Sequence, residues 1–190
     1  MLILASQSPR RKELLGHLHI PFTVRVAHID ETMDPAKPAQ SEVARVSQAK
    51  ALAVPREEGD VVIAADTIVV LDGRVLGKPA HKADAHAMLT ALSGQSHQVM
   101  TGLTVLRGDK FLTQTEITDV FFRPLSQKEI DRYVESGEPM DKAGAYGIQG
   151  GASLFVEKLH GDYYNVMGLP VCRLWQMLQS LVPEITEDFQ

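Results

Sequence analysis

Cysteine is almost absent from this sequence, since Cys172 is the single cysteine in 190 residues. One thiol cannot form an intramolecular disulfide framework, and sparing use of cysteine is typical of a reducing compartment. Long apolar runs are also missing, and no stretch approaches the roughly 20 residues that a membrane-spanning helix needs. The run at residues 2–5 is too short for the apolar region of a signal peptide and has no basic segment before it. We therefore expect a cytoplasmic protein with no membrane attachment.

A surplus of positive charge is missing too, because 19 Lys and Arg face 24 Asp and Glu, for a net charge of −5. Net acidity argues against general binding to nucleic acid or to anionic membranes, although it leaves room for a local basic pocket. The apolar share of 44% and the charged share of 23% are those of an ordinary globular protein and exclude global disorder. The length predicts a single domain over 1–190 that can bury a core, with at most a sub-lobe.

Helix and strand signals alternate along the chain. Ser8 before Pro9 and the capping box Ser126-x-x-Glu129 mark helix starts. The expected strands are residues 2–5, residues 61–65 and 68–71 as one long strand or two consecutive ones, the hairpin runs 97–107 and 110–122, and two strands flanking His160-Gly161-Asp162. The expected helices open at Pro9, cover about 41–54 and about 82–92, run from Ser126 to near Gly137, and follow Pro170 before an acidic tail that frays from Pro183. This order predicts an α/β fold with a mixed, twisted sheet, long hairpins and flanking helices.

Several cations occupy the first predicted helical turn, in the motif Ser6-x-Ser8-Pro9-Arg10-Arg11-Lys12. Free backbone N–H groups and the helix dipole already make a helix start electropositive, so added cations are unfavourable there. A bound polyanion offsets that cost, and we interpret the Ser-Pro-Arg-Arg cluster as a phosphate site. A solvated basic helix face is the alternative, and for Lys12 alone it is the preferred interpretation.

Asp66 interrupts an apolar β-branched stretch between residues 61–65 and 68–71. An unpaired carboxylate is expensive to bury, so Asp66 needs a cation, a metal or several hydrogen-bond donors. An aspartate that bonds a loop backbone at a strand end is the structural alternative. We interpret Asp66 as part of a ligand site at the end of a sheet strand, where α/β proteins usually bind their ligands.

Two lysines are weaker candidates for the functional site. Lys50 falls in the same helical sector as the apolar residues Val43, Val46, Ala53 and Val54. Such a lysine either extends its ammonium group to solvent or points at an anion. Lys78, in Leu76-Gly77-Lys78-Pro79 after the second apolar run, is a similar case.

An acidic pair and a glycine-rich segment complete the candidates. Asp30-Glu31 lies on a predicted loop, where carboxylates beside phosphate-binding cations suit Mg²⁺ or Mn²⁺; a solvated acidic loop is the alternative. The segment Gly144-Ala145-Tyr146-Gly147-Ile148-Gln149-Gly150-Gly151 allows close approach of backbone to a ligand, with Gln149 as the specific polar group. A tight connection without a ligand is the alternative there.

The seven histidines lack metal-protease spacing and are interpreted as surface or structural residues, and Cys172 as a buried core thiol.

These motifs together resemble the Maf family of nucleotide pyrophosphatases. The opening run Leu2-Ile3-Leu4-Ala5-Ser6-Gln7-Ser8-Pro9-Arg10-Arg11-Lys12-Glu13-Leu14-Leu15 is similar to the family signature. The later motifs match in order: Ala65-Asp66-Thr67, Gly77-Lys78-Pro79, Leu92-Ser93-Gly94 and Asp141-Lys142-Ala143-Gly144-Ala145-Tyr146-Gly147-Ile148-Gln149-Gly150. The resemblance therefore covers nearly the whole chain.

The resemblance implies a fold like that of inosine triphosphate pyrophosphatases, with a cleft between two lobes. It implies hydrolysis of a nucleoside triphosphate to the monophosphate and pyrophosphate by a homodimer that needs a divalent cation, Mg²⁺ or Mn²⁺. The implied catalytic residues are Asp66, Lys50 and Lys78, and the implied metal ligands are Glu31 and Asp66. The implied substrate-binding residues are Ser8, Arg10, Arg11, Thr67 and Gln149.

Within the family, this chain resembles the subgroup that prefers dTTP and UTP at Arg10, Thr67 and Gln149. The subgroup that prefers 7-methyl-GTP tends to carry Trp, Gln and Glu at these positions. One departure concerns the position three residues beyond Gln149, where many relatives have a second glycine and this chain has Ala152 after Gly151. Two other functions remain open: a nucleotide-binding regulator of cell division and septum formation, and a metal-dependent phosphomonoesterase.

Overall fold

The structure is a computed structural model that describes residues 1–186, and the chain divides into two compact units. Unit 1 consists of Met1–Asp66, Thr101–Glu116 and Gly168–Gln190, and unit 2 consists of Thr67–Met100 and Ile117–Met167. Each unit is thus assembled from segments that lie far apart in the sequence. The prediction of one domain over 1–190 stays a prediction.

The strands form a mixed sheet, as predicted. They are β1 (Leu2–Leu4), β2 (Phe22–Val24), β3 (Val61–Leu71), β4 (Arg74–Leu76), β5 (Ser96–Arg107), β6 (Lys110–Phe122) and β7 (Val156–His160). Hydrogen bonding places them in the order β2-β1-β3-β5-β6-β7, with β4 paired to β3. Strand β1 is parallel to both β2 and β3, whereas β4 is antiparallel to β3 and β7 is antiparallel to β6. The long strands β5 and β6 are neighbours joined by the turn at Gly108 and Asp109, which confirms the predicted hairpin.

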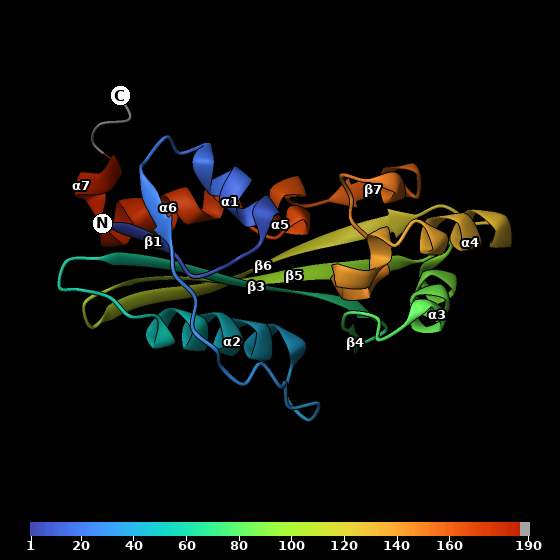
Figure 1. Cartoon of the computed structure of the whole chain (residues 1–190), viewed down its shortest axis with the longest axis horizontal. Helices are drawn as coiled ribbons and strands as arrows, with labels where there is room; N and C mark the ends of the chain where they lie inside the picture. The colour runs from blue at the N-terminus through green and yellow to red at the C-terminus, as the bar shows by residue number, and fades with distance from the viewer. Residues whose placement is uncertain (187–190) are drawn as a thin grey trace. The chain divides into compact units, whose positions relative to one another are not determined.

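Unit 1 encloses its strands between helices. It contains α1 (Pro9–Gly16), α2 (Ala39–Ala53), α6 (Val171–Leu181) and α7 (Pro183–Thr186). Helices α1 and α6 lie on one face of the strands and α2 lies on the other face (Figure 1). Apolar side chains between these layers form a core of Ile3, Ala5, Ala51, Val54, Val62, Ala64 and Leu106. Because both faces are covered, strand β1 and the first part of β3 are buried along their length and read as continuous apolar runs.

Unit 2 has its own core. It contains α3 (Lys82–Leu92), α4 (Gln127–Glu135), α5 (Tyr163–Met167) and three short 3₁₀ helices, η1 (Glu138–Asp141), η2 (Ala143–Ala145) and η3 (Gly151–Leu154). The predicted capping box at Ser126 and Glu129 is formed in both directions at the start of α4. Helix α3 packs against α4, and the core includes Leu89, Phe122, Tyr133, Tyr146 and Phe155.

Two local predictions were wrong, and a third, for the tail, is tested only in its first residues. The segment after Gly161 forms α5 instead of a strand, because Asp162 Oδ1 accepts a 2.8 Å hydrogen bond from the Tyr164 backbone N–H and so starts a helical turn. The tail expected to fray from Pro183 begins with α7, and its last residues, 187–190, lie outside the described residues. Cys172, expected in the core, is exposed because α6 turns Leu174, Met177 and Leu178 inward.

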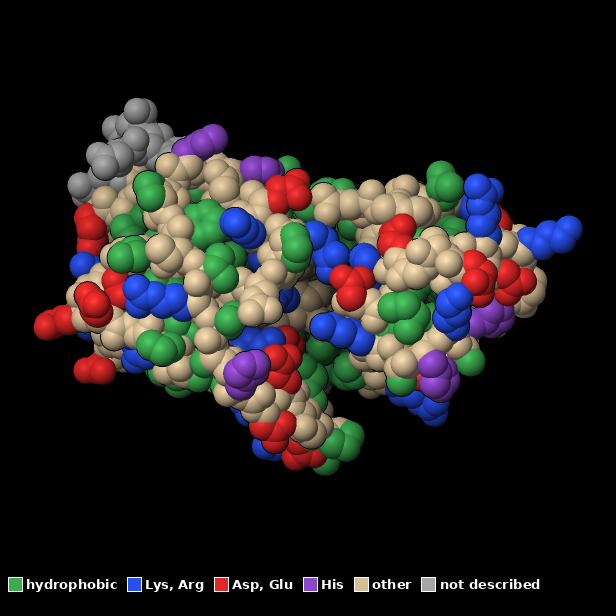
Figure 2. All heavy atoms as spheres, viewed as in Figure 1, with side chains coloured by type: hydrophobic (Ala, Val, Ile, Leu, Met, Phe, Trp, Pro, Cys, Tyr) green, Lys and Arg blue, Asp and Glu red, His purple; other side chains and the backbone are tan. Residues whose placement is uncertain are grey.

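The surface carries both signs of charge. On the face drawn in Figure 2, basic and acidic side chains are interspersed rather than gathered into a field of one sign. Within residues 1–186, no helix combines the length and the apolar character needed to cross a membrane.

Candidate active site

Two serines shape the turn between β1 and α1. Ser8 is the N-cap of α1, and its Oγ accepts a 3.4 Å hydrogen bond from the Arg11 backbone N–H, with Pro9 as the first helical residue. Ser6 Oγ accepts hydrogen bonds from the Ser8 backbone N–H at 3.2 Å and from Arg11 Nη1 at 3.3 Å. The predicted helix start is confirmed. Ser8 has a capping role here, and its contact with substrate stays a prediction.

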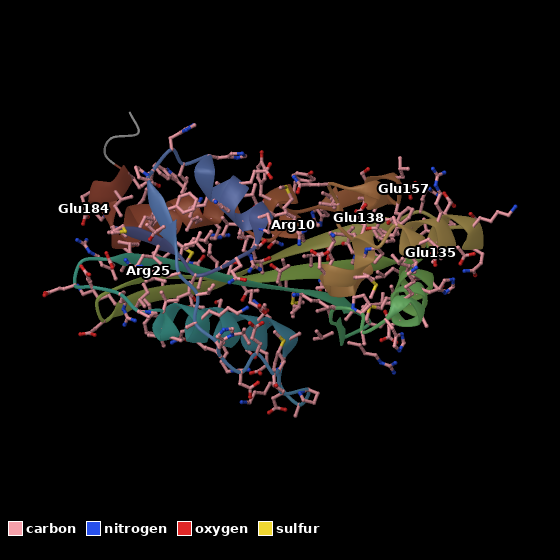
Figure 3. The ribbon with its side chains drawn as sticks, in the orientation of Figure 1. Arg10, Arg25, Glu135, Glu138, Glu157 and Glu184 are labelled. Carbon is pink, nitrogen blue, oxygen red and sulfur yellow. The ribbon has the colours of Figure 1, made fainter. Side chains whose placement is uncertain are left out.

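Arg11 is fixed at both ends of its guanidinium group. Besides the bond to Ser6, its Nε donates a 2.8 Å hydrogen bond to the carbonyl oxygen of Gly168, a residue 157 positions away in the sequence. Burial lowers the pKa of Arg11 and the nearby Asp66 charge opposes this shift, but a guanidinium keeps its charge in proteins. Arg10, labelled in Figure 3, precedes Arg11 in α1. Sequence reasoning could not find the Gly168 contact, because a backbone carbonyl leaves no residue-type signal.

Lys50 forms ion pairs with both carboxylates that were predicted to be metal ligands, Glu31 and Asp66. It lies near the end of α2, and 15% of its side chain is exposed. Its Nζ donates a 2.7 Å hydrogen bond to Asp66 Oδ1 and lies 3.0 Å from Glu31 Oε2. Lys50 therefore points at an anionic partner instead of extending to solvent. The cluster of Glu31, Lys50 and Asp66 comes entirely from unit 1.

Asp66 lies in the middle of a strand and not at its end, which corrects the sequence interpretation. Strand β3 continues from Val61 through Asp66 and Thr67 to Leu71 without a break. Only 12% of the Asp66 side chain is exposed. The Lys50 ammonium group compensates for its burial, as a buried carboxylate requires. A polar residue within an apolar run indicated a strand end, but here the strand continues through Asp66.

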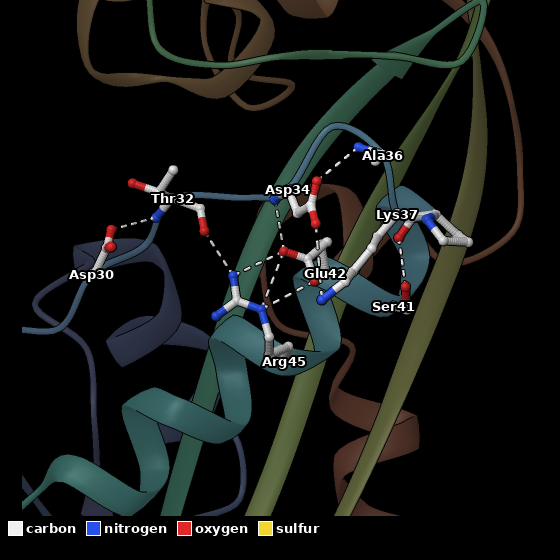
Figure 4. Close-up of polar contacts among 9 residues, drawn as sticks. Asp30, Thr32, Asp34, Ala36, Lys37, Ser41, Glu42 and Arg45 are labelled. Atoms are coloured by element: carbon white, nitrogen blue, oxygen red, sulfur yellow. Dashed lines mark hydrogen bonds and ion pairs between the residues drawn. The ribbon is translucent and has the colours of Figure 1, made fainter.

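The loop that carries Glu31 is held by an ion pair at the start of α2, in which Glu42 is buried and Arg45 is exposed (Figure 4). Glu42 is 3% exposed, and its Oε2 accepts hydrogen bonds from the Asp34 backbone N–H and from Arg45 Nη2, both at 2.9 Å. Arg45 Nη2 also donates to the carbonyl oxygen of Thr32 at 2.7 Å. The hydrogen bonds from Arg45, reinforced by the bond from Asp34, lower the pKa of Glu42 to about 2. Sequence reasoning missed this pair, although a Glu and an Arg three residues apart on a helix are neighbours.

The donor set of this cluster suits a hard divalent cation bound together with substrate. Carboxylate oxygens of Glu31 and Asp66 both lie within 3.0 Å of the same ammonium nitrogen. Over residues 1–186, no group of three or more His, Cys, Asp or Glu side chains could hold a metal ion. Mg²⁺ is usually bound by one or two carboxylates and completes its shell with waters and substrate phosphates. The residues present therefore fit such an ion and do not resemble a closed zinc site.

The other three predicted site residues belong to unit 2. Thr67 follows Asp66 on β3 and is partly buried, whereas Lys78 is exposed on the loop after β4. Gln149 is exposed on the loop between η2 and η3. The Gly144 backbone N–H donates a 3.0 Å hydrogen bond to the carbonyl oxygen of Gly77. The chain next to Lys78 is therefore tied to the segment that leads to Gln149, and the roles of these three residues stay predictions.

Comparison with known proteins decides the family. The sequence model of the Maf-like proteins matches residues 1–181. The chain belongs to the Maf-like family. A curated relative from Symbiobacterium thermophilum, named "dTTP/UTP pyrophosphatase", is 56% identical over 93% of this chain and 92% of its own. Relatives of the same name from Bacillus anthracis and Halalkalibacterium halodurans are 46% and 50% identical over 97% and 94% of this chain, and over the same shares of their own chains.

Among solved structures, this Maf-like protein is similar to a HAM1 protein from Coxiella burnetii. The likeness covers 94% of this chain and 98% of that chain, with 16% sequence identity and a TM-score of 0.48.

Proposed function

We propose that this Maf-like protein hydrolyses dTTP and UTP to the monophosphate and pyrophosphate, as an enzyme that cleanses the nucleotide pool. The relatives named dTTP/UTP pyrophosphatase, 46–56% identical over nearly the whole chain, support this substrate class. The observation that carries the proposal is the position of Lys50, whose ammonium group lies 2.7 Å from Asp66 and 3.0 Å from Glu31. A cation held between carboxylates beside an arginine is suited to phosphoanhydride chemistry, which depends mostly on positioning and electrostatics.

In the proposed reaction, one water is consumed and the bond between the α- and β-phosphates breaks. Asp66 accepts the proton of the attacking water, while Lys50 at 2.7 Å holds the carboxylate in place. Arg10, Arg11 and Lys78 bind the triphosphate and neutralise charge on the departing pyrophosphate. Glu31 and Asp66 would hold Mg²⁺ or Mn²⁺, which would supply charge neutralisation at the phosphate oxygens.

Gln149 is proposed to read the base. Uracil and thymine present an acceptor, donor, acceptor edge, and a primary amide can pair with N3–H and one adjacent carbonyl at once. Cytosine reverses one of these contacts, and a polar group left unpaired when the base binds gives discrimination. Thr67 is small enough to leave room for a pyrimidine, and Arg10 would repel the cationic base of 7-methyl-GTP.

The two alternative functions have no support from the relatives, which are named as pyrophosphatases. A protein that only binds nucleotides also gains nothing from Asp66 and Glu31 beside a phosphate site, because these carboxylates repel the ligand unless a metal intervenes. We further propose a cytoplasmic homodimer. The single exposed thiol of Cys172 supports a reducing compartment, and the homodimer is proposed from family resemblance alone.

The direct test is a panel of nucleoside triphosphates with Mg²⁺ and with Mn²⁺, in which pyrophosphate and phosphate are assayed separately. Pyrophosphate released together with dTMP or UMP, and preferentially from dTTP and UTP, is the expected result. Release of orthophosphate alone would identify a phosphomonoesterase, and tight binding without turnover would identify a regulator.

A further inference from the structure

The loop 147–151, which carries Gln149, is fastened at both ends to one pair of side chains. At its first residue, the Gly147 backbone N–H donates a 3.2 Å hydrogen bond to the hydroxyl oxygen of Tyr133. At its last residue, the Gly151 backbone N–H donates a 3.0 Å hydrogen bond to Glu138 Oε2. The Tyr133 hydroxyl in turn donates a 3.0 Å hydrogen bond to Glu138 Oε1. The two ends of the loop are thus connected through Tyr133 and Glu138, which we call the loop clamp.

The loop lies directly against this clamp, which explains its glycines. A Cβ atom added at Gly150 would lie 1.9 Å from Glu138 Oε1, far inside contact distance. A Cβ at Gly151 would lie 3.2 Å from the Tyr133 ring, and one at Gly147 would lie 2.6 Å from Cε of Lys142. Any side chain at Gly150 would therefore displace the Glu138 carboxylate. The absence of a side chain at Gly150 thus allows the backbone to lie directly against Glu138.

The clamp residues are themselves held in place. Tyr133 is 6% exposed, and its ring packs edge-on against Phe155 at 5.1 Å and 83°. Burial raises the pKa of the Tyr133 hydroxyl, so this group stays protonated and donates to Glu138. Glu138 is the first residue of η1 (Figure 3), and its backbone carbonyl accepts a 2.6 Å hydrogen bond from Lys142 Nζ. One anchor of the loop is therefore a packed side chain, Tyr133, and the other, Glu138, has its backbone held by Lys142.

Between its two anchored ends, the loop presents one polar side chain to solvent. Ile148 is 9% exposed and faces the protein, whereas Gln149 is exposed. The Gly150 backbone N–H closes the turn with a 3.1 Å hydrogen bond to the Gly147 carbonyl oxygen. With both ends and the turn fixed, the backbone position from which the Gln149 side chain extends depends on the clamp.

We propose that Tyr133 and Glu138 are positioning residues that set base discrimination by holding the Gln149 loop in one conformation. This inference rests on the proposed function for its consequence on substrate choice, but the clamp itself does not. A bidentate contact between an amide and a base edge depends on orientation, so a loosened loop loses discrimination before it loses phosphate binding. The expected signature is a changed preference between UTP and CTP with little change in kcat for UTP.

The test uses the full chain with Tyr133→Phe, Glu138→Gln and Gly150→Ala. Tyr133→Phe keeps the ring that packs on Phe155 and removes only the hydroxyl group. Gly150→Ala leaves both clamp side chains present but displaces the Glu138 carboxylate. Tyr163→Phe is the matched control, since it removes a hydroxyl from a tyrosine that is 40% exposed and belongs to the same unit.

Two readouts separate the clamp from the proposed function. Amide hydrogen exchange at Gly147 and Gly151 in the nucleotide-free protein should become faster by about 3- to 10-fold in the clamp variants, the scale of one lost hydrogen bond. The ratio of kcat/KM for UTP to that for CTP should fall by at least about fivefold, mostly through KM for UTP. The control should change neither quantity.

Unchanged exchange in Tyr133→Phe and Glu138→Gln would overturn the clamp. Faster exchange with an unchanged ratio of UTP to CTP would overturn its role in discrimination. If the parent protein hydrolyses neither nucleotide, the proposed function fails, and the ratio of UTP to CTP affinities measured by calorimetry takes the place of the kinetic ratio with the same expected fall.

Discussion

The Lys50 ammonium group donates a 2.7 Å hydrogen bond to the carboxylate of Asp66, and neither side chain has much exposure to solvent. One residue comes from helix α2 and the other from strand β3 of the same unit. Each charge compensates for the burial of the other, which is the condition under which buried ions persist in proteins. Each member of the pair is therefore needed to keep the other charge buried, in addition to its proposed role in catalysis.

Replacement of Lys50 with methionine removes the charge and keeps most of the side-chain volume. We expect kcat for dTTP to fall by at least about 100-fold, the usual loss when one preorganised electrostatic group is removed from an active site. Steady-state kinetics of purified protein measures this change. Lys12→Met is the control, because Lys12 is an exposed cation on α1 and should tolerate the same substitution. A Lys50→Met enzyme with parental turnover would remove Lys50 from the mechanism.

Arg11→Ala should weaken engagement of the triphosphate by about 1–3 kcal/mol, the typical contribution of a charge-assisted hydrogen bond. Binding of the corresponding nucleoside, which has no phosphates, should change far less. Because Arg11 also bonds Ser6 and the Gly168 carbonyl oxygen, calorimetry should be paired with a measurement of thermal unfolding. Equal losses for nucleoside and triphosphate would show that Arg11 acts through the fold.

The ion pair between the buried Glu42 and the exposed Arg45 predicts a pH dependence of stability. The pKa of Glu42 falls from 4.5 to about 2 on folding, chiefly through hydrogen bonds from Arg45. A carboxylate with a lowered folded pKa contributes stability that is complete above the unfolded pKa and is lost as the pH falls toward the folded pKa. The free energy of unfolding should therefore decrease between pH 4.5 and about 2, and Glu42→Gln should flatten this decrease.

Urea unfolding at a series of pH values measures the effect. Glu129, whose pKa is also lowered to about 2 by Arg123 and Ser126, provides a matched comparison in unit 2. Glu129→Gln should flatten the same curve independently, and the double variant should combine the two changes. An identical slope for the parent and Glu42→Gln would contradict the assigned shift.

Local patterns predicted most of the secondary structure because the physical cause of each element is local. Ser8 with Pro9 and Ser126 with Glu129 specify helix starts through bonds within four residues. The pattern around Lys50 left two alternatives open, extension to solvent or contact with an anion, and the structure shows the second. The segment after Gly161 was predicted to be a strand. It is a helix, because the Asp162 side chain accepts a hydrogen bond from the Tyr164 backbone N–H and starts a helical turn.

Contacts over long sequence separations were not predictable from residue types. The Gly168 carbonyl that fixes Arg11 is one case, and the link from Glu138 to the Gly151 backbone is another. Asp66 illustrates a different limit, because a polar residue within an apolar run indicates a special position but not where it lies along the strand. Sequence thus identified Glu31, Lys50 and Asp66 as charged candidates, and the structure supplied what holds them.

Base choice gives a further prediction. The parent enzyme should prefer dTTP and UTP to CTP, GTP and 7-methyl-GTP by at least about tenfold in kcat/KM, since a mismatched polar edge leaves buried groups unpaired. The combined variant Arg10→Trp/Thr67→Gln/Gln149→Glu should shift preference toward 7-methyl-GTP, because an aromatic face and a carboxylate favour a cationic base. A parent that prefers 7-methyl-GTP, or a variant with the parental ranking, would show that other residues select the base.

The central claim, that the Asp66 cluster catalyses pyrophosphate release, is tested most directly by the turnover of Asp66→Asn. Asparagine keeps the size of the side chain and cannot accept the proton of the attacking water. With folding verified by circular dichroism, pyrophosphate release from dTTP should fall by at least about 100-fold, the loss expected when a general base is removed. A folded Asp66→Asn protein that releases pyrophosphate at the parental rate would contradict the account.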